Sequence, residues 1–262
     1  MQLSAQHPPV FEGMISDTTF IKINDLNVNL VRYSYLNKGI NFLAVHDNED
    51  TGVKAAFQYI KENGGRIIDT QYGGVRNFTF TSMMSTYQID PNGIYTREGI
   101  EAGLAKFGNS HPDAFPSIEL AAQVILNLYD LKKNGYLFTL HNNGDGGFGI
   151  ASYLKGYELE KTGDSLHINF QMDPDDLIYV TEPKLFTCLK KADVNVVLQS
   201  QAALNDGSLS IYAMQQKIPY INVEVQHGHL GEHLRLIRIA VNALLETYPD
   251  LKEKTFPAAK ME

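Results

Sequence analysis

The sequence of 262 residues contains one cysteine and no tryptophan. A single thiol excludes an internal disulfide and a cysteine-based zinc site. Because Cys188 falls within the apolar stretch 185–189, we interpret it as a core residue and not as a catalytic nucleophile. The sequence also lacks the G-x-S-x-G elbow of serine hydrolases and the Walker A motif. Any metal site in this chain is therefore expected to use histidine and carboxylate ligands.

Basic residues are outnumbered by acidic ones, 22 against 30, and the formal net charge is −8. Nucleic-acid binding needs a basic face, so this balance excludes a nucleic-acid partner. No stretch approaches the roughly 18 consecutive apolar residues of a membrane-spanning helix. The first ten residues are polar and lack the apolar segment of a signal peptide. We expect a cytoplasmic protein from the sequence as written, and a periplasmic or secreted one if a signal peptide has been removed.

Strand-like and helix-like segments alternate along the chain. Nearly continuous apolar runs predict buried strands at 41–45, 66–70, 136–140, 177–180, 194–199 and 220–225. Helical periodicity lies between them, at 53–63, 117–133, 183–192, 208–217 and 230–247. Residues 18–33 alternate in polarity and predict an antiparallel hairpin at the sheet edge.

This alternation predicts an α/β fold, a three-layer α/β/α sandwich around a mixed, mostly parallel sheet. No internal repeat or low-complexity linker divides the chain, so we expect one catalytic domain over residues 1–262. Within it we place an edge hairpin at about 15–35, a core at about 40–247 and a C-terminal tail at 248–262. The sequence does not indicate the oligomeric state.

Histidine and glutamate follow three of the predicted strands. His46 and Glu49 come after the first, His141 after another, and Glu224 ends a third. Ligands of open α/β sheets bind outside the carboxyl ends of the strands, so these side chains are expected to converge. Catalytic zinc takes three nitrogen or oxygen ligands and needs a separate base for its water. We therefore predict one Zn²⁺ on His46, Glu49 and His141, with Glu224 as the base. The alternative is that each histidine is an ordinary hydrogen-bonded or solvated residue.

Two further sequence motifs could indicate a metal site or a nucleotide site. His229-Leu-Gly-Glu-His233 fits the H-x-x-E-H zinc pattern, but Gly231 weakens a helix there and little chain remains for a downstream ligand. We expect His229 and His233 to lie partly exposed near the start of the last helix, with His227 or His229 as a possible hydrogen-bond donor in the pocket. The stretch 144–149 matches G-x-G-x-x-G without a strand before it or a helix after it, so we interpret it as a turn.

The order of these residues resembles that of the M14-type zinc carboxypeptidase superfamily, including its succinylglutamate desuccinylase/aspartoacylase-like branch. His46-x-x-Glu49 resembles the family's HxxE zinc motif, His141 resembles its third ligand, and Glu224 resembles its catalytic glutamate. The resemblance runs from about residue 40 to 245 and implies a zinc-carboxypeptidase-like fold.

The resemblance also implies a substrate-binding segment between the first two metal motifs. Arg76 resembles the arginine that polarises the scissile carbonyl, a role suited to a fixed guanidinium. Asn92 resembles the first member of the family's Asn-Arg pair that grips a substrate carboxylate, but the next residue is Gly93. We expect Arg97 to reach the same pocket in its place. Ser210 lies near the position that lines the family's side-chain pocket.

The predicted function is a zinc-dependent, carboxypeptidase-like hydrolase that cleaves an amide bond in a small peptide or N-acyl amino acid. One alternative is an N-acyl amino acid deacylase of the desuccinylase/aspartoacylase type. Another is a non-catalytic binding module on a degenerate peptidase fold, which the missing arginine at Gly93 favours and the retained ligand set with Glu224 opposes.

Overall fold

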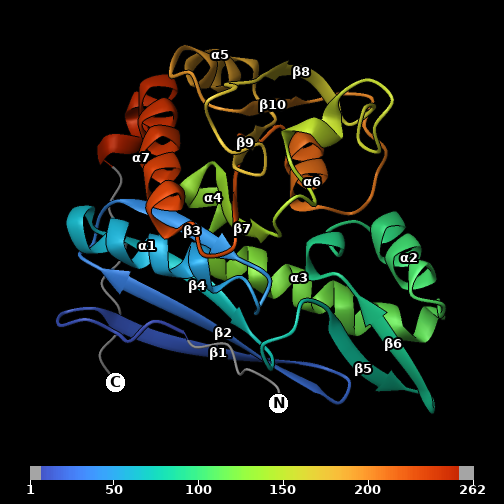
Figure 1. Cartoon of the computed structure of the whole chain (residues 1–262). Coiled ribbons are helices and arrows are strands. Elements are labelled where there is room, and N and C mark those ends of the chain that lie inside the picture. The colour runs from blue at the N-terminus through green and yellow to red at the C-terminus, as the bar shows by residue number, and fades with distance from the viewer. Residues whose placement is uncertain (1–6, 254–262) are drawn as a thin grey trace.

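The computed structural model describes residues 7–253, and within them a large mixed sheet forms the centre of the molecule (Figure 1). The sheet has nine strands in the order β1-β2-β4-β3-β7-β11-β9-β10-β8. In that order the strands are Ile15–Ile23, Leu26–Tyr35, Gly65–Gln71, Ile40–Ala44, Leu137–Asn143, Tyr220–Gln226, Leu177–Val180, Val196–Gln199 and Gly163–His167.

The four central strands β4, β3, β7 and β11 run parallel to one another. The expected hairpin of β1 and β2 joins β4 antiparallel at one edge, and β9 and β8 introduce antiparallel pairings on the other side. The prediction of an α/β fold around a mixed sheet is confirmed, with parallel pairing concentrated at its centre.

Helices cover both faces of the sheet. Helices α1 (Asp50–Asn63), α5 (Pro183–Lys191) and α7 (Leu230–Thr247) pack together on one face. Helices α3 (Phe115–Tyr129) and α6 (Leu209–Gln216) lie on the other side, where α2 (Arg97–Lys106) packs against α3 (Figure 1). The shorter helical elements are α4 (Leu131–Asn134), η1 (Pro91–Gly93), η2 (Pro112–Ala114), η3 (Ile150–Tyr153) and η4 (Pro249–Glu253). The expected turn at 144–149 is a turn that leads into η3.

One predicted helix is broken in the structure. The pattern predicts a continuous helix over 117–133, but the chain forms α3 and α4 with Asp130 between them in the left-handed region, at φ 58°. Aspartate tolerates this conformation better than most residues, and no glycine or proline marks the break in the sequence.

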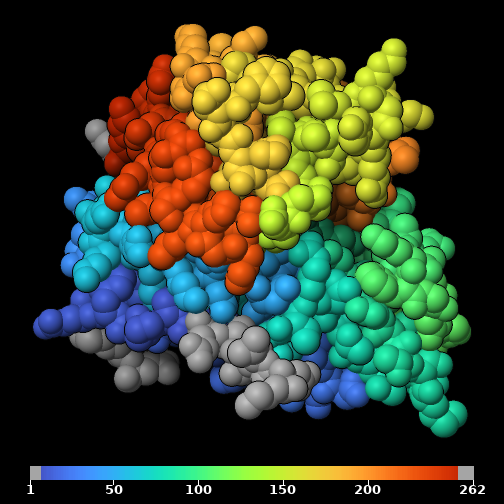
Figure 2. Space-filling view, in the orientation of Figure 1, coloured from blue at the N-terminus to red at the C-terminus, as the bar shows by residue number. Residues whose placement is uncertain are grey.

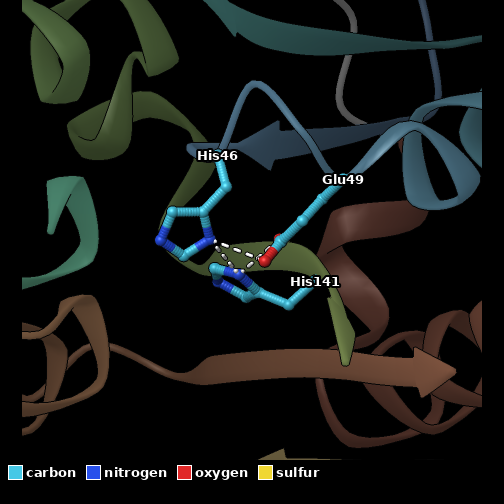
Figure 3. A group of neighbouring side chains, drawn as sticks. All are labelled: His46, Glu49 and His141. Atoms are coloured by element: carbon cyan, nitrogen blue, oxygen red, sulfur yellow. Dashed lines mark hydrogen bonds and ion pairs between the residues drawn. The ribbon is translucent and has the colours of Figure 1, made fainter. Parts of the chain in front are cut away.

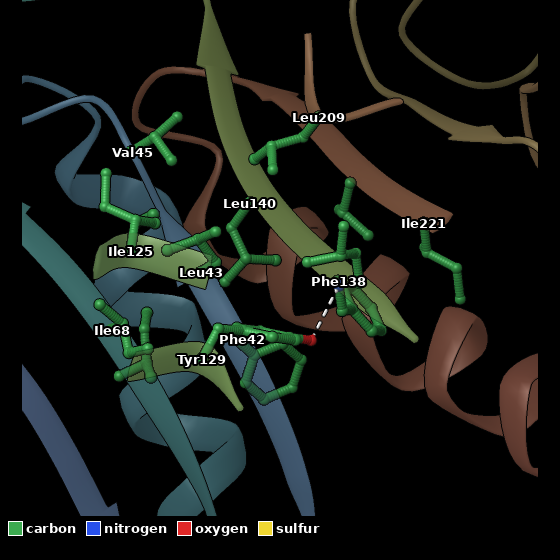
Figure 4. Close-up of a cluster of buried hydrophobic side chains, with 14 of the residues drawn as sticks. Phe42, Leu43, Val45, Ile68, Ile125, Tyr129, Phe138, Leu140, Leu209 and Ile221 are labelled. Atoms are coloured by element: carbon green, nitrogen blue, oxygen red, sulfur yellow. Dashed lines mark hydrogen bonds between the residues drawn. The ribbon is translucent and has the colours of Figure 1, made fainter. Parts of the chain in front are cut away.

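The core between α3 and the central strands is held by buried polar bonds as well as apolar packing (Figure 4). The fully buried Tyr129 hydroxyl accepts a hydrogen bond from the backbone N–H of Phe138 on β7 at 3.0 Å. The same hydroxyl donates to the carbonyl of Asn41 on β3 at 2.9 Å. These bonds fix the relative positions of the two strands that carry His46 and His141.

A second, two-stranded sheet lies between β4 and α2 and was not expected from the sequence. Its strands are β5 (Phe78–Ser82) and β6 (Ser85–Ile89), in which buried and more exposed side chains alternate. This short alternation is typical of a half-buried hairpin. Arg76 precedes the hairpin and Asp90 follows it, so the hairpin returns both residues to the same place. None of the helices among residues 7–253 is long and apolar enough to cross a membrane.

Candidate metal centre

The three predicted ligands meet at the carboxyl end of the central strands. His46 follows β3, Glu49 directly precedes α1, and His141 lies within β7 (Figure 3). The Nδ1 atoms of His46 and His141 are 3.1 Å apart. Glu49 places Oε1 2.9 Å from the first of these atoms and Oε2 2.9 Å from the second. All three residues are buried, with exposed fractions of 1 to 3%.

The loop that carries His46 and Glu49 is tied to the loop after β4. The carboxylate of Asp47 accepts hydrogen bonds from the backbone N–H groups of Tyr72 and Gly74, the latter at 2.7 Å. The Tyr72 hydroxyl donates to the carbonyl of Arg76 at 2.6 Å. The buried carboxylate of Asp47, 2% exposed, therefore fixes the turn between His46 and Glu49 to the loop after β4.

Asp90 completes the surroundings of His46. Its Oδ1 lies 2.7 Å from Nε2 of His46, and its Oδ2 lies 3.4 Å from Nη2 of Arg76. Although burial opposes ionisation, these two partners hold the pKa of Asp90 below its usual value. A carboxylate on Nε2 places the proton there and directs the lone pair of Nδ1 towards Glu49 and His141.

This donor set fits a zinc ion. Tetrahedral zinc with ligands at about 2.0–2.2 Å separates neighbouring donor atoms by about 3.3 Å, close to the separations of 2.9 to 3.1 Å found here. Two imidazole nitrogens and a carboxylate oxygen at such distances need a proton or a cation between them. Burial opposes protonation of His46, but Glu49 and Asp90 raise its pKa to about 9, which shows how strongly the cluster favours positive charge.

Glu224 lies beside this cluster on β11. The parallel register pairs it directly with His141 on β7, and paired residues of neighbouring strands project to the same face. Burial raises the pKa of Glu224 to about 7; the charge of Glu49 adds to the rise, and His141 opposes it. A carboxylate with a pKa near neutrality is suited to accept and return a proton.

Arg76 approaches the cluster from the loop before β5. Its Nη1 lies 2.6 Å from Oε1 of Glu49, and the side chain is 48% exposed. The guanidinium thus reaches from solvent to Glu49, at the rim of the candidate metal centre.

A cavity of about 600 Å³ opens next to these residues. Figure 2 shows the surface hollowed between the yellow-green segment and the teal-to-green segment that contains α2. Asn92 and Ser210, two of the predicted substrate-binding residues, line this cavity together with Arg76 and Glu224. Its size is typical of a site for a small ligand.

The structure places Arg97, the third predicted substrate-binding residue, elsewhere. Its Nη1 forms an ion pair with Glu119 at 2.5 Å, and its guanidinium stacks over Phe115 at 4.1 Å. Arg97 is not among the described residues that line the cavity. The spacing of four residues from Gly93 suggested a shared pocket, but Arg97 begins α2 and projects towards α3.

The histidines of the H-x-x-E-H stretch do not form a metal site together. His233 was expected to be partly exposed, and this is wrong: it is fully buried. It shares the apolar face of α7 with Leu234 and Ile237, and that spacing could have revealed its burial. Burial lowers the pKa of His233 to about 3. His229 is half-buried before α7, and His227 lines the cavity as expected for one of the two.

His7 contacts two buried carboxylates, and the sequence did not predict these contacts. Its Nε2 lies 3.3 Å from Asp47 and its Nδ1 2.9 Å from Asp69, and both carboxylates are buried. These carboxylates, which hydrogen-bond to His7, raise its pKa to about 10. Cys188 packs against the core from α5, which agrees with its interpretation as a structural residue.

Comparison with known proteins gives similarities of fold only. No family model matches the chain, and no curated protein matches it. Among solved structures, an aspartoacylase family protein from Mesorhizobium loti is 14% identical at a TM-score of 0.47, covering 88% of this chain and 67% of that one. Murein-tripeptide amidase MpaA from Escherichia coli O157 is 11% identical at a TM-score of 0.43, covering 93% and 98%.

A third similar structure is bovine thrombin-activatable fibrinolysis inhibitor in complex with tick carboxypeptidase inhibitor. It is 11% identical at a TM-score of 0.46, covering 89% of this chain and 90% of that one. These similarities concern the course of the chain, and at such values they do not identify its activity.

Proposed function

We propose that this protein is a zinc-dependent hydrolase of an amide bond in small peptides or N-acyl amino acids. The observation that carries the proposal is the convergence of His46, Glu49 and His141, whose imidazole Nδ1 atoms are 3.1 Å apart and each lie 2.9 Å from an oxygen of the Glu49 carboxylate, beside Glu224. A bound zinc ion would supply Lewis-acid chemistry and lower the pKa of a water molecule.

The protein's own groups then have distinct roles. Glu224 accepts a proton from the attacking water and returns it to the leaving nitrogen, and its raised pKa suits both transfers. The guanidinium of Arg76 stabilises the negative charge that develops on the carbonyl oxygen. Asp90 keeps the ring of His46 in one orientation and tautomer. Asn92 and Ser210 orient the substrate within the cavity.

The motif-based prediction of a carboxypeptidase-like activity needs a clamp for a terminal carboxylate. Gly93 supplies no side chain, and Arg97 is held by Glu119. The proposal therefore rests on amide hydrolysis, with carboxypeptidase and deacylase as its two forms. They differ in which side of the scissile bond carries the free carboxylate.

Metal content and turnover test the proposal together. We expect one equivalent of zinc by elemental analysis, lost in His46→Ala and retained in His111→Ala, a control at a histidine with its side chain 59% exposed. Glu224→Gln is expected to retain zinc and to lose about 100- to 10,000-fold in kcat, whereas Glu101→Gln on the exposed side of α2 keeps both.

The substrates for these measurements are a panel of short peptides and N-acyl amino acids. Hydrolysis of peptides from the C-terminus supports the carboxypeptidase form, and hydrolysis of N-acyl amino acids alone supports the deacylase form. A native protein that binds no zinc and hydrolyses neither set would contradict the proposal and favour a non-catalytic binding module.

A further inference from the structure

The cavity beside the metal centre contains little free positive charge. Among the described residues that line it, Arg76 is the only lysine or arginine. Its Nη1 is engaged by Glu49 at 2.6 Å and its Nη2 approaches Asp90 at 3.4 Å. The charge of Arg76 is therefore committed to the reacting end of the cavity and is already balanced by carboxylates.

A negative charge, that of the Asp206 carboxylate, is present on the cavity wall. Asp206 lines the cavity, is exposed, and forms no ion pair with any Lys, Arg or His in residues 7–253. Its Oδ1 accepts the backbone N–H of Ser208 at 2.9 Å, so the carboxylate is oriented while its charge remains uncompensated.

Backbone packing fixes the position of Asp206. The next residue, Gly207, has φ +77°, and a Cβ there would lie 2.4 Å from the carbonyl oxygen of Gly93. On the other side, a Cβ on Gly99 would lie 2.1 Å from the Cα of Gly207. Only glycine permits this close approach. The segment that presents Asp206 is thereby pressed against η1 and α2.

Gly93 is the residue beside Asp206 from which a cationic side chain could have projected. A Cβ built on Gly93 would meet only the carbonyl oxygen of Asp206, at 3.4 Å. The backbone there leaves room for a side chain, and φ at Gly93 is not in the left-handed region. Gly93 itself lines a smaller adjoining cavity of about 250 Å³, which Asp206 and Lys106 also line. In the larger cavity Asp206 has no cationic partner, since Arg76 is engaged by Glu49 and Arg97 is paired with Glu119.

Aromatic rings form the neighbouring wall. Phe148, Tyr153, Tyr179 and Tyr220 all line the cavity. Burial raises the pKa of each of the three tyrosines, so the hydroxyls are neutral. Asp206 lines the same cavity as these rings. Neutral aromatic rings next to a carboxylate are a favourable environment for an organic cation.

We propose that the cavity binds a positively charged group of the substrate, an alkylammonium or guanidinium, against Asp206 and the aromatic wall. This inference rests on the proposed function, because it names the class of amide substrate that the same site accepts. A lysine-like or arginine-like side chain satisfies Asp206 without requiring the carboxylate clamp that Gly93 lacks.

Matched substrates test the inference. N-acyl derivatives and acyl-alanyl dipeptides of lysine, norleucine and glutamate differ in charge at similar length. We expect kcat/KM of the zinc-loaded protein for lysine to exceed that for norleucine by about tenfold and that for glutamate by more. The lysine-to-norleucine ratio should fall to about one in Asp206→Asn and stay unchanged in the control Asp164→Asn, a neutralised exposed acid outside the cavity.

A binding measurement separates this inference from the proposed function. In calorimetric titrations of the zinc-free protein, pentylammonium should bind more tightly than pentanol, and Asp206→Asn should remove the difference. Equal binding of the two compounds would overturn the inference whether or not the protein is a hydrolase. Equal turnover of all three substrates would also overturn it while leaving amide hydrolysis intact. If none of the substrates is hydrolysed, the proposed function fails, and the titration alone decides whether the cation site exists.

Discussion

The side chain of Asn142 accepts a hydrogen bond from the backbone N–H of Gly52 at 3.1 Å. Its amide nitrogen donates to the carbonyl of Val225 at 3.0 Å and lies 3.3 Å from Nδ1 of His233. Asn142 follows the proposed ligand His141, Gly52 lies in the first turn after Glu49, and Val225 follows Glu224. The buried side chain of Asn142 therefore connects three segments. They carry Glu49 and His141, two of the proposed ligands, and Glu224, the proposed base.

Asn142→Ala should lower zinc affinity by more than its loss of folding stability alone would cause. Loss of the amide leaves buried backbone groups unpaired and costs about 1–3 kcal/mol of stability. Because the segments of Glu49, His141 and Glu224 lose their common link, we expect zinc affinity to fall about 10- to 100-fold. Competition with a chromophoric chelator, well below the unfolding temperature, measures that affinity. Asn127→Ala, on the exposed side of α3, is the control, and unchanged zinc affinity in Asn142→Ala would contradict a positioning role.

Asp90→Asn should reduce zinc affinity about 10- to 100-fold with little change in fold. The amide keeps the shape of the carboxylate but loses the charge that acts on Nε2 of His46 and on Arg76. Chelator competition reports the affinity, and circular dichroism reports the fold. Asp145→Asn, an exposed residue in the turn before η3, should behave as the unmodified protein. An Asp90→Asn protein that binds zinc as tightly as the original would show that Asp90 acts only on Arg76.

Acidification should destabilise the fold through His233. Burial places its folded-state pKa at about 3, below the ordinary value of 6.5, so the unfolded chain binds more protons between these values. The free energy of unfolding therefore falls as pH decreases from 6.5 towards 3, by at most about 1.4 kcal/mol per pH unit from this group. Denaturant titrations from pH 7 to pH 4 measure the slope. His233→Gln should be less steep than the original protein, and parallel curves would remove His233 as a cause.

His7 should act in the opposite direction and at higher pH. Its folded-state pKa of about 10 lies above the ordinary 6.5, because Asp47 and Asp69 bind the imidazolium. Its contribution to stability is complete below pH 6.5 and is lost as pH rises through 10. His7→Gln should therefore be less stable than the original protein at pH 6, with a difference that shrinks towards pH 10. Denaturation midpoints at the two values provide the test, with His167→Gln as a comparison at a histidine that pairs with one exposed acid. A constant difference would mean that the charge of His7 is not involved.

The sequence predicted the parts of the site that depend on strand ends. His46, His141 and Glu224 follow or end apolar runs, and the carboxyl ends of parallel strands meet at one edge of the sheet. Strand β7 extends three residues beyond the predicted run of 136–140, so His141 lies within it and is the register partner of Glu224, which the predicted strand at 220–225 already contained. The apolar pattern stops where polar site residues begin, although the hydrogen-bonded ladder continues.

Contacts between distant segments were not predictable in the same way. Asp90 reaches His46 only because the β5–β6 hairpin turns the chain back, and that hairpin is too short to stand out from its surroundings. His7 finds Asp47 and Asp69 through the packing of an irregular segment that has no periodicity to interpret. The helix break at Asp130 lacks a glycine or proline signal. Arg97 begins α2 and points away from the cavity towards Glu119. Its spacing from Gly93 in the sequence does not indicate the direction of its side chain.

The proposed reacting groups and some of the residues that would contact the substrate lie in different kinds of structure. The register between β7 and β11 holds His141 and Glu224 side by side. His141 and Glu224 are held by buried strands, whereas Asp206 and Phe148 belong to the connections between elements. Connections tolerate exchange far better than buried strands do. Variation at positions such as 148 and 206 is therefore expected to change which molecules the cavity accepts while His141 and Glu224 keep their spacing, so a library of variants in these connections is a practical way to select for new ligands.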